Sequence, residues 1–258
     1  MNNNPIGVFD SGFGGLSVWC ALRSALPNES LIYLGDGKNC PYGERTREEI
    51  CGFSDEAVVR LLDKGCKLIV VACNTATAMA IGYLREKYGD IQFVGLEPAV
   101  KPACQTTRSG VVGVLATARS LEGDLFRRTA SKFAGECEIL TAVGEGFVEA
   151  VENDAEETPE TEILVRNVLQ PMIDRGADRI VLGCTHYPFL RGVMERVVGG
   201  REVLILDSGA AVARRTGQLL DMYGLRAAES HKAVYEFDTV ADEEYRQRLE
   251  RRAFACKI

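Results

Sequence analysis

Two cysteines in this 258-residue sequence stand where a thiol could act as an acid or a base. Cys73 closes the apolar run KLIVVAC, and Cys184 closes the run RIVLGC. Such runs are typical of buried parallel strands, and ligands of open α/β sheets bind at the carboxyl ends of strands. The residues that follow suit the start of a helix, because Asn74 and Thr75 are good N-caps and Pro188 suits a first helical turn. We therefore expect both thiols at the functional edge of a sheet, next to a helix N-terminus.

Thiols in such places suit proton transfer at a carbon atom. A free cysteine is only about 3% thiolate at pH 7. A helix N-terminus stabilises an adjacent anion by up to about 2 kcal/mol, which moves a thiol toward the balance of thiol and thiolate that acid–base catalysis needs. With one thiol on each side of a stereocentre, a thiolate removes the proton from one face and the opposite thiol protonates the other. The pair predicts an enzyme that inverts a stereocentre.

The elements that must position these thiols alternate between short apolar runs and helical patterns. The expected strands are IGVFD (6–10), SLIYLGD (30–36), KLIVVAC (67–73), IQFVGLE (91–97), GVVGVLAT (110–117), CEILTAV (137–143), RIVLGCT (179–185) and EVLILDS (202–208). Helical patterns lie between them, at 16–26, 47–64, 75–88, 121–133, in the acidic region after 143, and from about 188. This alternation predicts an α/β protein with mostly parallel sheets joined by right-handed crossovers.

An internal repeat divides the chain. GVFDSG at Gly7 resembles GVLATA at Gly113, and LIVVACNT resembles RIVLGCT, with nearly the same separation between the members of each pair. In that register Ser11 corresponds to Thr117, and the two cysteines correspond to each other. We therefore expect two similar, pseudo-symmetric α/β domains, with the active site in the cleft between them.

Composition narrows the class of protein. The net charge is −7 and the isoelectric point is near 5.1, which argues against nucleic acid or an anionic membrane as a partner. The basic cluster RQRLERR has helical spacing and is expected to be a solvated helix face. Neither a signal peptide nor a membrane span is expected, since no apolar run approaches the roughly 18 residues of a transmembrane helix.

Cysteine usage points to reduced thiols. Nine cysteines are scattered without a C-x-x-C pair, and only two histidines are present, so no metal site is expected. This usage is typical of a cytoplasmic protein in which most cysteines are small core residues.

The motifs GVFDSGFGGLSV, YLGDGKNCPYGERT, VVACNTATA, VGLEPAVKPA, VLGCTHYPFL and LDSGAAVAR together resemble those of glutamate racemases, in the cofactor-independent aspartate/glutamate racemase superfamily. The resemblance runs nearly end to end, and the first, third and fifth motifs in this order are a specific signal. It implies a discontinuous first α/β domain of residues 1–97 and 207–258, and a second of residues 98–206. It also implies interconversion of L- and D-glutamate without a cofactor, in the cytoplasm, supplying D-glutamate for peptidoglycan, the cell wall and cell shape. Members of the family are often dimers, so a homodimer is expected.

The resemblance also assigns roles to residues. The two catalytic cysteines would be Cys73 and Cys184. Asp10, His186 and Glu149 would support acid–base chemistry or orientation. The substrate contacts would be Asp10, Ser11, Tyr42, Gly43, Asn74, Thr75, Thr117, Thr185 and His186. Hydroxyls and backbone amides of this kind hold carboxylates well at helix N-termini.

One motif bears on specificity, and one position departs from the family. The second cysteine motif reads C-T-H, whereas related racemases that prefer aspartate more often have C-T-E, so glutamate is favoured over the alternative of a related acidic amino acid such as aspartate. The sequence departs from the family at Gly37, where serine or threonine is usual.

Alternatives from other classes remain open. Gly12, Gly14 and Ser17 nearly satisfy the G-x-G-x-x-G loop of an NAD-binding oxidoreductase. The third glycine is missing, however, and Asp10 would repel the pyrophosphate. A thiol redox protein would pair Cys73 with Cys184 in a reversible disulfide. Pyridoxal phosphate is not expected, since no strand-end lysine suits a Schiff base.

Overall fold

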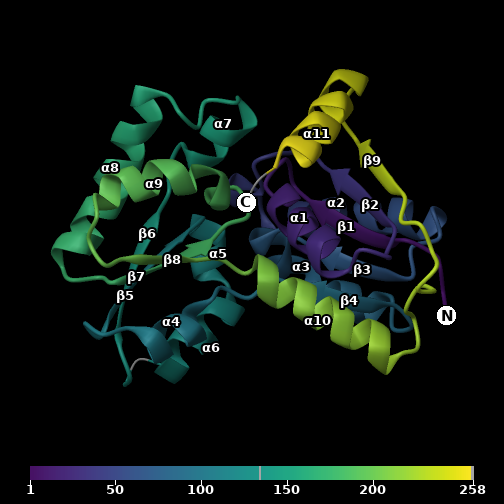
Figure 1. The fold of residues 1–258 in the computed structure, drawn as a ribbon, viewed down its shortest axis with the longest axis horizontal. Coiled ribbons are helices and arrows are strands. Elements are labelled where there is room, and N and C mark those ends of the chain that lie inside the picture. The colour runs from purple at the N-terminus through teal and green to yellow at the C-terminus, as the bar shows by residue number, and fades with distance from the viewer. Residues whose placement is uncertain (134, 257–258) are drawn as a thin grey trace. The chain divides into compact units, whose positions relative to one another are not determined.

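The computed structural model describes residues 1–133 and 135–256. The chain divides into two compact units, the first comprising Met1–Leu96 and Gly209–Ile258 and the second Glu97–Ser208 (Figure 1). Within the described ranges, no helix is both long enough and apolar enough to span a lipid bilayer.

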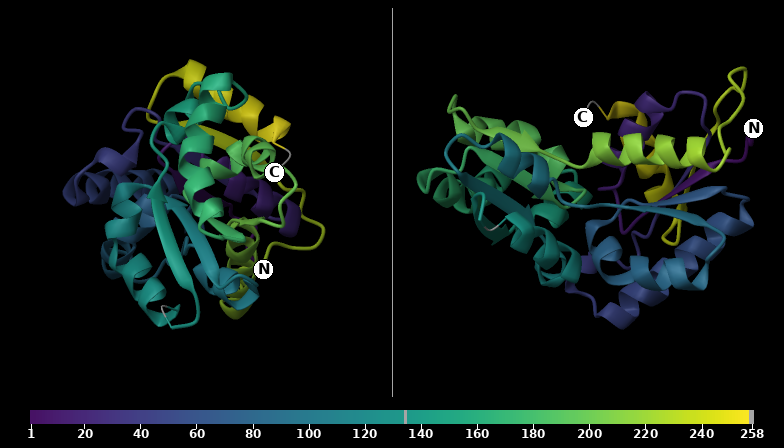
Figure 2. Two further views of the ribbon diagram at one scale, coloured as in Figure 1. Left: turned by 90° about the vertical axis from the view of Figure 1, so that its left-hand side faces the viewer. Right: turned by 90° about the horizontal axis from the view of Figure 1, so that it is seen from below.

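Unit 1 is built on a parallel sheet with the strand order β4-β3-β1-β2-β9. Its strands are β1 (Ile6–Asp10), β2 (Leu31–Gly35), β3 (Leu68–Val71), β4 (Gln92–Gly95) and β9 (Tyr235–Thr239). Its helices are α1 (Leu16–Ala25), the 3₁₀ turn η1 (Tyr42–Glu44), α2 (Arg47–Asp63), α3 (Asn74–Lys87), α10 (Gly209–Met222) and α11 (Glu243–Ala255). Helix α1 packs on α10 and α11, and α2 packs on α3, so helices cover both faces of the sheet (Figure 2).

Unit 2 contains a second parallel sheet with the strand order β6-β5-β7-β8. Its strands are β5 (Val111–Ala116), β6 (Glu138–Val143), β7 (Arg179–Gly183) and β8 (Leu204–Leu206). Its helices are α4 (Val100–Thr106), α5 (Ala118–Glu122), α6 (Asp124–Phe133), α7 (Phe147–Glu152), α8 (Pro159–Asp174), the 3₁₀ turn η2 (Tyr187–Leu190) and α9 (Arg191–Val198). The predicted α/β class with parallel sheets is therefore confirmed.

The two sheets repeat one topology. Read from the opposite edge, the order β8-β7-β5-β6 matches β4-β3-β1-β2, and β9 extends only the sheet of unit 1. The packing repeats as well, because Gly7 of β1 and Gly113 of β5 each leave no room for a Cβ. Such an atom would lie 2.8 Å from Ile69 Cδ1 in unit 1 and 2.7 Å from Ile180 Cδ1 in unit 2. The repeated glycine lets the neighbouring strand's isoleucine fill the same space in both units.

Several elements were not predicted from the sequence. Strand β9 and helices α4 and α10 lie in segments for which no element was expected, and the helical pattern at 121–133 splits into α5 and α6 at Gly123. Gly123 has an extended backbone (φ −66°, ψ 141°), which ends α5 before α6 begins.

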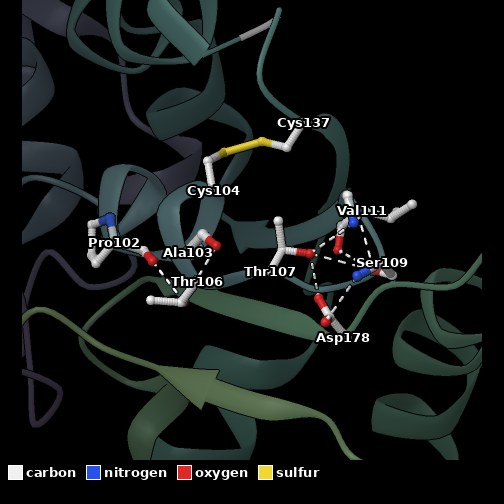
Figure 3. The surroundings of a disulfide bond; sticks show 10 residues. Pro102, Ala103, Cys104, Thr106, Thr107, Ser109, Val111, Cys137 and Asp178 are labelled. Atoms are coloured by element: carbon white, nitrogen blue, oxygen red, sulfur yellow. Dashed lines mark hydrogen bonds between the residues drawn. A yellow bond between two sulfur atoms is a disulfide. The ribbon is translucent and has the colours of Figure 1, made fainter.

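The expectation of reduced thiols throughout is contradicted in unit 2. Cys104 of α4 and Cys137, just before β6, form a disulfide with a Cα–Cα distance of 5.7 Å (Figure 3). Both residues are buried in the apolar cluster that α4 forms with β5 and β7. This pairing could not be predicted, since the two cysteines are 33 residues apart and lie in no recognisable motif. A crosslink over this separation stabilises a fold by about 4 kcal/mol.

Thiol counting tests this pairing. Denatured protein purified without reductant is expected to show seven reactive thiols, and nine after reduction, because the described residues include every cysteine and seven of them are outside the disulfide. Cys104→Ser is expected to lower the free energy of unfolding by about 4 kcal/mol relative to the oxidised parent. Nine thiols before reduction would contradict the disulfide.

Candidate functional site

In each unit, the polar candidates collect at the carboxyl edge of the sheet. In unit 1, Asp10 is the last residue of β1, and Cys73 follows the adjacent strand β3. In unit 2, Thr117 follows β5, and Cys184 follows the adjacent strand β7. Ligands of open parallel sheets bind at this edge. Each unit therefore carries one such cluster of candidate residues, here called a half-site, on equivalent strands.

Cys73 begins helix α3 through its own side chain. It is the N-cap of the helix, and its Sγ accepts a hydrogen bond from the backbone amide of Ala76 at 3.4 Å. The sequence suggested Asn74 or Thr75 for this role, but both lie within the first turn. An amide donating to sulfur at a helix N-terminus favours the anionic thiolate. The same thiol lies 3.8 Å from Ser11 Oγ.

The loop after β1 is held rigidly around Asp10. The Asp10 side chain is buried, and its Oδ1 accepts the Gly12 amide at 2.9 Å. The Tyr33 hydroxyl donates to the Gly12 carbonyl at 2.6 Å. A Cβ on Gly15 would lie 2.5 Å from the Asp10 Cβ, so only glycine lets the loop turn this tightly over the carboxylate. The glycines of this loop thus serve close packing around an acid.

Asp36 and Tyr42 form a buried pair in the loop after β2. The Tyr42 hydroxyl donates to Asp36 Oδ2 at 2.6 Å, and Asn39 Nδ2 donates to both carboxylate oxygens at 3.0 Å. Burial raises the pKa of the Tyr42 phenol well above its usual range, and the Asp36 carboxylate adds to this shift. Because its hydroxyl is bonded to Asp36, Tyr42 orders the loop that carries Gly43.

Asn74 and Thr75 are both buried directly after Cys73. The Asn74 side-chain nitrogen is a buried donor without a hydrogen-bond partner among residues 1–133 and 135–256. An unpaired buried donor costs about 1–3 kcal/mol, which a carboxylate acceptor would recover.

In unit 2, a thiol, an imidazole and a carboxylate follow one another. Cys184 Sγ lies 3.8 Å from His186 Nδ1, and His186 Nε2 lies 2.6 Å from Glu152 Oε1. The ionised carboxylate can only accept, so Nε2 carries the hydrogen and the Nδ1 of a neutral imidazole is an acceptor facing the thiol. The His186 side chain is 2% exposed and that of Glu152 16%. Thr185, between the thiol and the imidazole, is also buried.

The glutamate that contacts His186 is one that the resemblance did not name. Glu149 is exposed on α7, whereas Glu152, one turn later, reaches the imidazole. The segment GEGFVEAVE contains three glutamates, and nothing in their spacing distinguishes the one that faces inward. The contact of Glu152 with His186 was therefore not predicted, and neither was the hydrogen bond between Tyr42 and Asp36.

The backbone after Cys184 also differs from the expected helix. A 3₁₀ turn, Tyr187–Leu190, precedes α9, so no α-helix begins beside this thiol. A short 3₁₀ turn has a smaller dipole than an α-helix. Buried Tyr187 donates to the Gly144 carbonyl at 3.4 Å, and burial raises the pKa of its phenol well above the usual range. The polar support for Cys184 comes from the imidazole rather than from a helix.

Thr117 has a capping role at the carboxyl end of β5. Its Oγ1 accepts the Ser120 amide at 3.2 Å, which caps α5, and its hydroxyl lies 2.9 Å from Ser120 Oγ. Both residues are buried. Two hydroxyls are thereby held together at the sheet edge of unit 2.

The raised pKa of Tyr42 predicts a specific loss of stability at high pH. The unfolded phenol ionises near pH 10 while the folded one keeps its proton, so the stabilisation is complete below pH 10 and is lost as the pH rises above it. Each pH unit above 10 costs about 1.4 kcal/mol from this group. Urea unfolding of Tyr42→Phe between pH 10.5 and 11.5 should give a free-energy slope shallower than the parent's by about this amount. Parallel slopes would mean that the phenol ionises freely in the folded protein.

Comparison with known proteins agrees with this arrangement. Residues 18–216 match the family model described as Asp/Glu/Hydantoin racemase. The chain is 46% identical over 242 residues to a glutamate racemase of Herpetosiphon aurantiacus, covering 94% of each protein. A glutamate racemase isoform from Bacillus anthracis superposes with a TM-score of 0.88 at 30% identity, over 100% of this chain and 96% of that one. The Escherichia coli glutamate racemase, solved with L-glutamate and the activator UDP-MurNAc-Ala, superposes with a TM-score of 0.85 at 33% identity, over 97% and 95%. The chain therefore belongs to the Asp/Glu/hydantoin racemase family.

Proposed function

We propose that this chain interconverts L-glutamate and D-glutamate by proton transfer through Cys73 and Cys184, without a cofactor. The observation that carries the proposal is the repeat of one arrangement, in which a buried cysteine follows the equivalent strand in each unit. The family and the relatives named glutamate racemase support this reaction. A solved relative from Francisella tularensis was crystallised with D-glutamate and the E. coli relative with L-glutamate, so both enantiomers bind related proteins.

Inversion at a carbon atom requires an acid and a base on opposite faces. A single thiol could only return a proton to the face from which it took it. We infer that the two half-sites act on one glutamate, one thiolate removing the α-proton and the other thiol delivering a proton to the opposite face. The C–H bond electrons remain on the α-carbon as a planar carbanion between the two steps. The thiol and the thiolate exchange roles after each turnover, so the reaction runs in both directions.

The two thiols have different supporting groups. The Sγ of Cys73 contacts the Ala76 amide of α3 and the Ser11 hydroxyl. Asp10, whose carboxylate accepts the Gly12 amide, directly precedes Ser11. Cys184 has His186, oriented by Glu152. In this proposal, Asp10 binds the α-ammonium or orients the first base, and the His186–Glu152 pair holds a proton beside the second.

The substrate carboxylates need donors that are already in place. We propose that Ser11, Asn74, Thr75, Thr117 and Thr185 bind them, together with backbone amides of Tyr42 and Gly43. The unpaired Asn74 nitrogen supports this role, since it is a buried donor without an acceptor among the described residues. Such a donor breaks no existing hydrogen bond when it binds an anion, and it gains a charge-assisted one.

The biological setting follows the family. We propose that the D-glutamate product is used for peptidoglycan, that the protein acts in the cytoplasm, and that it is a homodimer. The disulfide of unit 2 joins Cys104 to Cys137 and includes neither Cys73 nor Cys184.

Single-cysteine variants test the two-base assignment. Cys73→Ala and Cys184→Ala are each expected to lower the racemisation rate by at least 10³-fold in both directions, because each face of the carbon then lacks its acid or base. The assay follows the circular dichroism of L- or D-glutamate over time, with aspartate as the specificity control.

Cys66→Ala is the matched control. This thiol is also buried in unit 1, and burial raises its pKa to about 12, so it stays protonated and takes no part in the reaction. The control should racemise at the parent's rate. An undiminished rate in either Cys73→Ala or Cys184→Ala would overturn the assignment, and faster turnover of aspartate than of glutamate would overturn the substrate.

A further inference from the structure

Helix α11 reaches the first half-site through an aromatic ring. The Tyr245 ring stacks on Phe13, with ring centroids 4.5 Å apart and planes inclined by 12°. Phe13 is fully buried and lies two residues after Ser11 in the loop that follows β1. Stacked aromatic pairs contribute beyond the area that they bury and favour one relative orientation of the rings. The C-terminal helix therefore has a direct contact with the loop that carries Asp10 and Ser11.

The same tyrosine occupies the space beside Gly37. A Cβ built on Gly37 would lie 2.3–2.6 Å from Cζ and both Cε atoms of Tyr245. The φ angle of Gly37 lies outside the left-handed region, so the backbone does not itself require glycine. The ring is what excludes a side chain. A side chain at position 37 and the stacked position of Tyr245 are therefore mutually exclusive.

Gly37 directly follows Asp36, so Tyr245 contacts both loops of the first half-site. The two loops are already joined, because the Asp36 amide donates to the Asp10 carbonyl at 2.9 Å. The Asp36 carboxylate in turn holds Tyr42. A shift of the ring would act on both loops at once.

Two arginines complete the cover over Phe13. The guanidinium carbons of Arg248 and Arg252 lie 4.8 and 5.2 Å from the centre of its ring, within the range of cation–π contacts. The basic cluster of α11 was expected to be a solvated helix face, and for these two side chains that expectation is wrong. Three side chains of α11 therefore contact the ring of Phe13, namely Tyr245, Arg248 and Arg252.

We propose that Tyr245 is a positioning residue that holds the Asp10–Phe13 and Asp36–Asn39 loops in the geometry needed for proton transfer at Cys73. Gly37 is the residue that makes room for it. The inference rests on the proposed function for its effect on catalysis, but the position of the ring and the exclusion of a side chain at Gly37 do not depend on that function.

Three variants and a control test the proposal. Tyr245→Ala removes the ring, Gly37→Ala displaces it without removing any core side chain, and Tyr245→Phe keeps the stacking. We expect Tyr245→Ala and Gly37→Ala each to lower kcat about tenfold in both directions, whereas Tyr245→Phe stays within about threefold of the parent. Gln247→Ala, an exposed position on the same helix, should match the parent. Thermal melting confirms that each variant is folded.

The double variant Gly37→Ala/Tyr245→Ala gives the sharpest readout. Once the ring is gone, the added methyl group has nothing to displace, so the double variant should be no slower than Tyr245→Ala. Multiplicative losses, about a hundredfold together, would overturn the proposal, as would a parent-like kcat in folded Gly37→Ala.

The positioning role of Tyr245 can also be tested by a measurement that does not depend on turnover. The amide ¹H–¹⁵N resonances of Ser11 and Gly12 should shift in Gly37→Ala and Tyr245→Ala but not in Gln247→Ala. A parent that fails to racemise glutamate, with these shifts present, would overturn the proposed function and leave the positioning role supported. Absent shifts would overturn the positioning role even in an active enzyme.

Discussion

Polar groups leave a buried parallel sheet at the carboxyl ends of its strands, and both half-sites are built at such ends. The interior of β3 and β7 is apolar and closed to water. A thiol placed one or two residues beyond such a strand is held by rigid backbone and yet meets the loops that can bind a ligand. Cys73 and Cys184 both lie at this point. The Ser11 hydroxyl and the Ala76 amide contact the first of these sulfurs, and the His186 imidazole contacts the second.

The two sheets share one topology, but the groups that contact the cysteine differ between the two units. The strand orders match, and a glycine in β1 and in β5 makes the same room for an isoleucine. Unit 1 uses a helix N-terminus and a hydroxyl, whereas unit 2 uses an imidazole backed by a carboxylate. A reversible proton transfer needs two groups of similar proton affinity, and unlike environments can achieve that when each is tuned separately. The C-terminal segment adds to unit 1 alone, where β9 extends the sheet and α11 covers Phe13.

Much of the fold could be predicted because its signals are local. Apolar runs located β1 and β3 to within two residues at their ends, and the paired motifs indicated the repeat. The thiols could be predicted because strand ends are visible in the sequence. What could not be predicted depends on contacts between distant segments. Examples are Glu152 facing His186 and the disulfide between Cys104 and Cys137. The departure at Gly37 has a physical reason only when Tyr245, far along the chain, is in view.

Incorporation of solvent deuterium during the first few per cent of conversion distinguishes two bases from one. L-glutamate is incubated with the protein in D₂O, and the α-carbon of each enantiomer is analysed by mass spectrometry after chiral separation. With a separate base on each face, the product D-glutamate carries deuterium from the second thiol while the remaining L-glutamate keeps its original hydrogen. Deuterium appearing first in recovered L-glutamate, or a product that retains the original hydrogen, would show that one group serves both faces and would overturn the two-base assignment of Cys73 and Cys184.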